Sequence, residues 1–169
     1  LAARPAPTCP DFSDGQTVYL WGESRRLRLE PAARGRNAFL RDQDIVLQVH
    51  PGDTPAQRQA LLNSFYRAQL DARIRACLPY WEGKTGLHPA SVQIKNMKTR
   101  WGTCNTAAKR IWLNLQLVKQ PPVCLDYVLA HELTHLLHPD HGNGFWAFLL
   151  RVMPDCKAVR KALNEAPFL

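Results

Sequence analysis

The sequence predicts an α+β fold, because short alternating strand patterns come first and helical patterns follow. A chain of 169 residues with 46% hydrophobic residues is long enough for one domain with a buried core and too apolar for general disorder. We expect one domain over residues 15–169, with N-terminal strands in residues 15–53 and a core in residues 54–169. The Pro- and Ala-rich residues 1–14 should form a weakly ordered lead-in.

The N-terminal strands should lie on either side of tight turns. Residues 17–29 alternate around a turn at Gly22–Ser24, and residues 38–49 repeat this pattern before the turn at Pro51–Asp53. Thr54 and Pro55 then mark a helix start, with Thr54 as the N-cap and Pro55 at the first helical position. The apolar residues that follow have helical spacing. This long scaffold helix should end before Pro79 or continue, kinked, to Trp81.

The rest of the chain predicts a small sheet followed by helices. Val92–Lys95 should be a strand, Trp101–Asn105 has the composition of a turn, and Ile111–Leu117 alternates as a strand does. Three helices should follow, beginning near Pro121–Pro122, Phe145 and Pro154–Asp155. No apolar run approaches the ~18 residues that a membrane span needs, so no membrane partner is expected.

The first of these helices carries the sequence H-E-L-T-H-L-L-H-P-D-H, from His131 to His141. His131 and His135 lie one helical turn apart, so both imidazoles can reach one metal ion. The helix, expected over Val123–Leu137, is apolar nearly all round and should be buried. Glu132 lies about 100° around the helix from His131, where it can accept a proton from an activated water as general base.

His141 can join these two histidines only if the helix ends before it. Six further residues of straight helix would carry it about 9 Å from His135. Pro139 and the turn-forming residues around it supply the break. The spacing equals that of the metzincin signature, although His138 stands where that signature has glycine. We expect His138 to lie beside the site or on the surface. Three imidazoles that leave one position open for water indicate a catalytic zinc ion.

The chain also resembles a known family. The segments that carry the likeness are Met97–Cys104 with its R-W-G-T-C element, Ile111–Asn114, Asp126–Val128, the histidine helix, His141 and Phe145–Trp146. This order resembles the YgjP-like metallopeptidases, a zincin-like group related to the SprT-like and WLM proteases. The resemblance implies a zincin-like fold, His131, His135 and His141 as zinc ligands and Glu132 as the catalytic residue. The substrate does not carry over from the family, and the histidine motif itself leads us to expect a peptide or protein substrate. In such folds the Ile111–Leu117 strand would be the sheet edge along which an extended peptide adds.

The roles of Arg100 and Trp101 stay open between two interpretations. Arg100 could stabilise an oxyanion or bind a substrate carboxylate. Alternatively, Trp101 fills core space while Arg100 pairs with Asp126 or Asp155, which is the interpretation we favour from the sequence.

Charge and cysteine content leave further alternatives. The net charge is +8, and no carboxylate occurs between Glu82 and Asp126, so a nucleic-acid-associated module is one alternative. SprT-like relatives that act on DNA-bound proteins add to it, and a structural zinc domain without catalysis is another. The five cysteines form no C-x-x-C pair, which favours a reducing compartment and hence a cytoplasmic location. The sequence predicts no oligomeric state.

Overall fold

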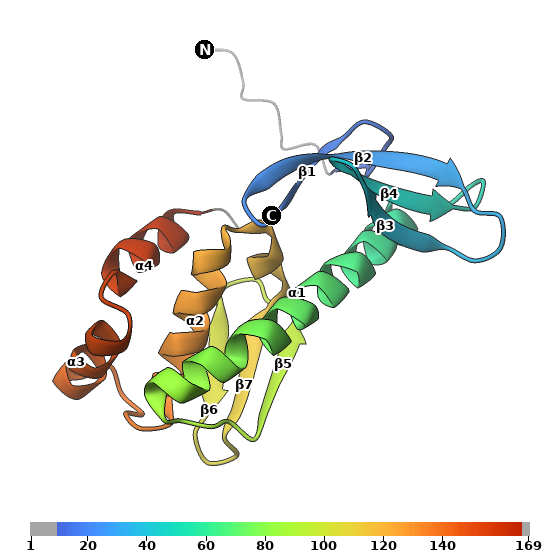
Figure 1. Ribbon diagram of the computed structural model, residues 1–169. Coiled ribbons are helices and arrows are strands. Elements are labelled where there is room, and N and C mark those ends of the chain that lie inside the picture. The colour runs from blue at the N-terminus through green and yellow to red at the C-terminus, as the bar shows by residue number, and fades with distance from the viewer. Residues whose placement is uncertain (1–9, 167–169) are drawn as a thin grey trace, which may run out of the picture. The chain divides into compact units, whose positions relative to one another are not determined.

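The computed structural model describes residues 10–166, which form seven strands, one 3₁₀ helix and four α-helices (Figure 1). The predicted α+β class is therefore confirmed. The contacts divide the described chain into two compact units. One consists of the residues up to Val18 together with Ser24–Phe65, and the other of Tyr19–Glu23 together with the residues from Tyr66 onward.

The N-terminal sheet contains the strands that the alternation predicted. Its members are β1 (Thr17–Leu20), β2 (Glu23–Pro31), β3 (Asn37–Arg41) and β4 (Asp44–Val49). They lie in the order β1-β2-β4-β3, with β2 parallel and β3 antiparallel to β4. The alternating apolar side chains supply its core, since Leu27, Ile45 and Leu47 are fully buried.

The predicted lead-in falls mostly on residues 1–9, which lie outside the described residues. Its last part is described and has hydrogen-bond partners. The guanidinium of Arg58 donates to the carbonyl oxygens of Asp11, at 2.7 Å, and Phe12, at 3.0 Å.

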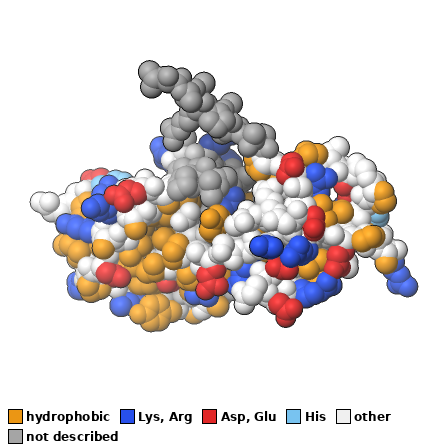
Figure 2. All heavy atoms as spheres, turned by 90° about the horizontal axis from the view of Figure 1, so that it is seen from above, with side chains coloured by type: hydrophobic (Ala, Val, Ile, Leu, Met, Phe, Trp, Pro, Cys, Tyr) orange, Lys and Arg blue, Asp and Glu red, His pale blue; other side chains and the backbone are white. Residues whose placement is uncertain are grey.

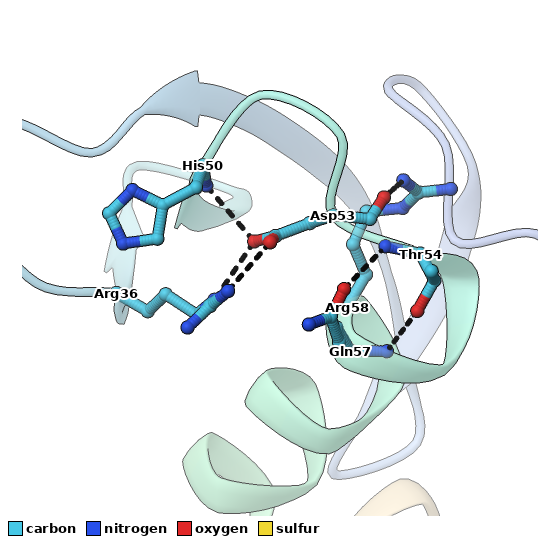
Figure 3. Close-up of polar contacts among 6 residues, drawn as sticks. All are labelled: Arg36, His50, Asp53, Thr54, Gln57 and Arg58. Carbon is cyan, nitrogen blue, oxygen red and sulfur yellow. Dashed lines mark hydrogen bonds and ion pairs between the residues drawn. The ribbon is translucent and has the colours of Figure 1, made fainter.

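Helix α1 (Pro55–Thr85) begins as the sequence predicts. The Thr54 hydroxyl accepts from the backbone N–H of Gln57, and the Gln57 side chain accepts from the N–H of Thr54, which is a capping box (Figure 3). Just before the cap, both carboxylate oxygens of Asp53 accept from Arg36, at 2.9 and 2.7 Å. These hydrogen bonds lower the pKa of Asp53 to about 2.

Of the two predicted ends of this helix, the one before Pro79 is wrong. The helix continues through Pro79, as the alternative predicted, but it runs beyond Trp81 to Thr85. Tertiary contacts beyond the proline explain the difference. Trp81 is buried, and its indole N–H donates to the carboxylate of Asp126 at 2.9 Å. The helix ends where Gly86, at φ +72°, donates to the carbonyl oxygen of Glu82.

The second sheet differs from its prediction in two ways. It contains β5 (Ser91–Lys95), β6 (Gly102–Asn105) and β7 (Arg110–Asn114) in the order β5-β7-β6. The Trp101–Asn105 segment, predicted as a turn, therefore supplies a strand. The strand predicted over Ile111–Leu117 is the central strand rather than an edge, and it ends at Asn114.

Asn114 explains why β7 stops there. Its side chain is fully buried and donates to the carbonyl oxygens of Met97 and Arg100, at 3.0 and 2.7 Å. Its side-chain oxygen accepts from the N–H of Gln116, which caps the 3₁₀ helix η1 (Leu115–Lys119). The alternation continues through η1 because its own leucines are buried, so the pattern hides the change of structure.

Helix α2 (Pro122–His135) is the predicted histidine helix and is largely buried, as the sequence predicted. It lies at the centre of the second unit. It packs against β6, β7, η1, α3 (Asn143–Val152) and α4 (Cys156–Glu165) (Figure 1). The four described cysteines are free thiols. Among residues 10–166, none of the helices has the length and apolar character needed to span a bilayer.

Candidate metal centre and active site

The three predicted histidine ligands converge at the C-terminal end of α2. The possible ligand atoms of His131, His135 and His141 all lie within 4.8 Å of one another. The helix ends at His135, two residues earlier than expected, and the chain folds back through Pro139. The side chain of Asp140 then accepts from the N–H of Gly142, next to the start of α3. This reversal brings His141 opposite the histidines of the helix.

His138 points away from this group. A methyl carbon on Gly144 would come within 2.9 Å of its Cε1, so its ring lies directly over the first turn of α3. Its carbonyl oxygen lies 3.2 Å from Nδ1 of His135. Donation by this Nδ1–H to the carbonyl leaves Nε2 of His135 free for a metal. His138 thus lies beside the site, one of the two places expected for it, and contacts the site through its backbone carbonyl.

Two aromatic residues fix the histidine rings further. The hydroxyl of Tyr127 lies 3.2 Å from Nδ1 of His131, which favours Nε2 of His131 as the metal-facing atom. The ring of Phe145 is fully buried, and its centroid lies 4.8, 4.8 and 4.9 Å from those of His131, His135 and His141. From the sequence alone we assigned no role in the site to Tyr127 or Phe145. Tyr127 precedes His131 by one helical turn, which is the signal that could have identified it.

The electrostatics of the site suit a cation. Burial, followed by the neighbouring histidines and Arg160, lowers the pKa of His131 to about 3, and burial also lowers that of His135. Both imidazoles are therefore neutral at pH 7 and present lone pairs. Nε2 of His131 lies 3.2 Å from Nε2 of His141. A metal ion is the natural partner for nitrogen atoms that face each other at this distance, so the donor set fits zinc.

Glu132 lies beside the histidines and is only 5% exposed. Burial raises its pKa to about 7, and the positive charge of Arg100 opposes that rise. The strand β6 approaches α2 closely here because residue 102 is glycine. A methyl carbon at Gly102 would lie 2.8 Å from Cγ1 of Val128 and 3.2 Å from Oε1 of Glu132.

Two hollows open on either side of these residues. One of about 240 Å³ extends from Arg100 and Gly102 towards Tyr127 and α4, where Arg160 lines it. The other, of about 250 Å³, extends along β6 towards Pro139. Both are lined by four shared residues, namely Arg100, Gly102, His131 and Glu132. The hollows form one candidate substrate site around His131 and Glu132.

Arg100 does not form either of the ion pairs that we favoured from the sequence. Among the described residues, neither Asp126 nor Asp155 pairs with it, and Asp126 accepts from Trp81. The exposed Arg100 instead lines both hollows. Trp101 is partly buried, and its carbonyl oxygen accepts from the N–H of Asn114 at 2.9 Å.

Convergent imidazoles on a buried H-E-x-x-H helix, next to a buried carboxylate, define the class of metal-dependent hydrolases. The family model of the YgjP-like metallopeptidase domain matches residues 1–166, and the chain belongs to this family. It is therefore a metallopeptidase, an enzyme that hydrolyses peptide bonds, as the sequence predicted.

Two solved structures of metallopeptidase zymogens are similar to this chain. Abylysin of Pyrococcus abyssi is 21% identical, with a TM-score of 0.49 over 53% of this chain and 90% of its own. Jannalysin of Methanocaldococcus jannaschii is 20% identical, with a TM-score of 0.49 over 55% of this chain and 88% of its own. The comparison with curated proteins found no match.

Proposed function

We propose that this metallopeptidase uses zinc, that His131, His135 and His141 hold the ion, and that Glu132 is the general base. The convergence of the three imidazoles within 4.8 Å, beside the buried Glu132, carries the proposal. A zinc ion held by three imidazoles would supply a Lewis acid and would lower the pKa of water toward ~7.

The chain's own residues supply the proton transfers. A carboxylate with a pKa of about 7 can accept a proton from the attacking water and later return it to the leaving amine. The Tyr127 hydroxyl and the His138 carbonyl hold two imidazoles in the orientation that presents Nε2.

The test combines metal content with peptide turnover. Glu132→Gln should retain one equivalent of zinc and lose turnover by roughly 10²- to 10⁴-fold. His135→Ala should lose the zinc as well. Glu165→Gln is the matched control, because this exposed glutamate on α4 lines neither hollow. Turnover by Glu132→Gln at the rate of the unsubstituted protein would refute the assigned general base.

We propose β6, rather than the predicted β7, as the sheet edge to which an extended peptide adds as a further strand. The carbonyl of Trp101 accepts from Asn114, and hydrogen-bonded pairs alternate along an antiparallel ladder. The backbone groups of Gly102 and Cys104 therefore point away from β7, and both residues line the 250 Å³ hollow. An extended substrate can pair with them as an added strand.

Proline substitution tests this edge. Cys104→Pro removes an outward N–H and leaves the ladder to β7 intact, so kcat/KM should fall about 3- to 10-fold relative to Cys104→Ala. Urea unfolding of both variants measures any strain that the proline adds. Equal kcat/KM values in the two variants would exclude strand addition at this position.

A structural zinc domain, one of the two alternatives from the sequence, would need a fourth protein ligand. Among the described residues, the possible metal-binding group has three members. This observation favours the catalytic proposal over the structural one.

The nucleic-acid alternative has no comparable observation in its favour. On the face that Figure 2 shows, Lys and Arg side chains are interspersed with Asp and Glu side chains. The alternative stays a prediction from charge. Binding of duplex DNA that falls steeply with salt would support it, and no binding at low salt would exclude it.

A further inference from the structure

The hollow of about 240 Å³ beside Glu132 contains two arginines from distant parts of the chain. Arg100 precedes β6, and Arg160 lies on α4. Glu132 is the only carboxylate among the residues that line this hollow. The lining thus holds two guanidinium groups and one carboxylate. The hollow is therefore a positively charged space next to the proposed general base.

Arg160 is held over this space by two neighbours. Its guanidinium carbon lies 5.3 Å from the ring centroid of Trp146. Its hydrogen bond with the Tyr127 hydroxyl, together with its charge, opposes the burial that raises the pKa of Tyr127. Neither the Trp146 ring nor the Tyr127 hydroxyl carries a negative charge that would neutralise the guanidinium of Arg160. The guanidinium thus stays free to bind an anion.

Although its charge acts on the nearby Glu132, Arg100 also forms no ion pair among the described residues. It lies within the stretch between Glu82 and Asp126 that contains no carboxylate, so its sequence neighbours cannot neutralise it. The side chain of Asn164 adds an amide to the same hollow. Guanidinium and amide N–H groups together match the two oxygens of a carboxylate.

We propose that Arg100 and Arg160 form a subsite that binds a carboxylate of the substrate next to the bond that is cleaved. The subsite rests on the proposed function, since the substrate is a peptide. A hollow of this size holds a single residue rather than a long segment. The carboxylate belongs either to an acidic side chain or to the C-terminus of the peptide, and the chemistry of recognition is the same.

The test uses one peptide sequence in matched forms. The first pair differs only by glutamate or glutamine at a position adjacent to the cleaved bond, and each adjacent position is tried in turn. The second pair differs only by a free or an amidated C-terminus one residue beyond that bond. The carboxylate form of at least one pair should have a kcat/KM roughly 10- to 100-fold higher. The pair that shows this preference identifies the source of the carboxylate, and equal kcat/KM values in every pair would overturn the proposal.

Substitutions then locate the subsite. Arg160→Gln and Arg100→Gln should each reduce the ratio of kcat/KM between the carboxylate form and its neutral match, and Arg160→Lys should retain part of it. Lys161→Gln and Lys98→Gln remove the same charge from exposed positions that do not line the hollow, and should leave the ratio unchanged. If the preference for the carboxylate form survives both arginine substitutions, other groups cause it and the proposed subsite is refuted.

Binding separates this proposal from the proposed function. Calorimetry with zinc-loaded Glu132→Gln protein should show the same preference for the carboxylate form, and Arg160→Gln in that background should remove it. If the unsubstituted protein cleaves no peptide while this binding preference holds, the peptidase proposal fails and the carboxylate subsite stands. If peptides are cleaved but neither cleavage nor binding discriminates the forms, only the subsite fails.

Discussion

Replacing Gly102 by alanine should damage the proposed active site and the fold at the same point. The added carbon would lie 2.8 Å from Cγ1 of Val128, about 0.7 Å less than the ~3.5 Å at which carbon atoms pack favourably. Val128 is buried and β-branched, so it cannot rotate away at low cost. The backbone of β6 or the side chain of Glu132, which is 3.2 Å from the added carbon, must move instead.

The expected magnitude follows from this overlap. Overpacking of a buried contact costs about 1–3 kcal/mol of unfolding free energy, which lowers Tm by roughly 2–12 °C for a chain of this size. A shift of Glu132 by a fraction of an ångström should lower kcat/KM by about 10- to 100-fold. Metal content should stay at one equivalent, because no histidine ligand touches Gly102 in this contact.

The assay compares Gly102→Ala with Gly83→Ala in urea unfolding, thermal unfolding and peptide turnover. Gly83 lies in α1 with open space around its Cα, so alanine there should stabilise the protein slightly. The double variant Gly102→Ala with Val128→Ala should recover part of the lost turnover, because it relieves the shortest contact. Unchanged stability and turnover in Gly102→Ala would refute the close approach of β6 to α2.

Three further predictions concern the metal and an ion pair. Tyr127→Phe removes the hydroxyl that orients His131 and should weaken zinc binding roughly 10- to 100-fold in a chelator competition, and an unchanged affinity would contradict that role. Zinc at 100 times its dissociation constant should stabilise the metal-free protein by about 2.7 kcal/mol in urea unfolding and leave His135→Ala unaffected. Arg36 lowers the pKa of Asp53 from 3.8 to about 2 in the folded protein. The ion pair therefore stabilises the fold fully above pH 3.8, and this stabilisation is lost as the pH falls toward about 2. The unfolding free energy of Arg36→Gln should therefore lie below that of the unsubstituted protein at neutral pH, and the gap should narrow between about pH 4 and about pH 2.

The parts of the site that the sequence predicted are those that local geometry determines. His131 and His135 share a helix face by their spacing alone, and Pro139 with its turn-forming neighbours makes a chain reversal necessary before His141. The start of α1 was equally predictable, because a capping box involves residues only three apart.

The errors arose where tertiary contacts overrode local patterns. The hydrogen bond from Trp81 to Asp126 holds α1 in helical form beyond Pro79. Local sequence patterns could not reveal this contact, because Asp126 lies on a helix more than forty residues away. Asn114 ends β7 with hydrogen bonds to a preceding loop, while the burial pattern continues unchanged into η1. Arg160 could not be assigned to the site from sequence, since only the packing of α4 on α2 places it there.

The R-W-G-T-C element shows why a correct motif was given the wrong local structure. Glycine at 102 suggested a turn, yet the structure uses its missing side chain to let β6 approach α2 at Val128 and Glu132. The same five residues place Arg100 in both hollows, anchor the strand through the Trp101 carbonyl and turn the backbone of Cys104 toward the open edge. The element therefore lines one side of the proposed active site, in a hollow that the three histidines also line. Substitutions within it should alter the turnover of peptides while the bound metal stays in place, which distinguishes this element from the histidine helix.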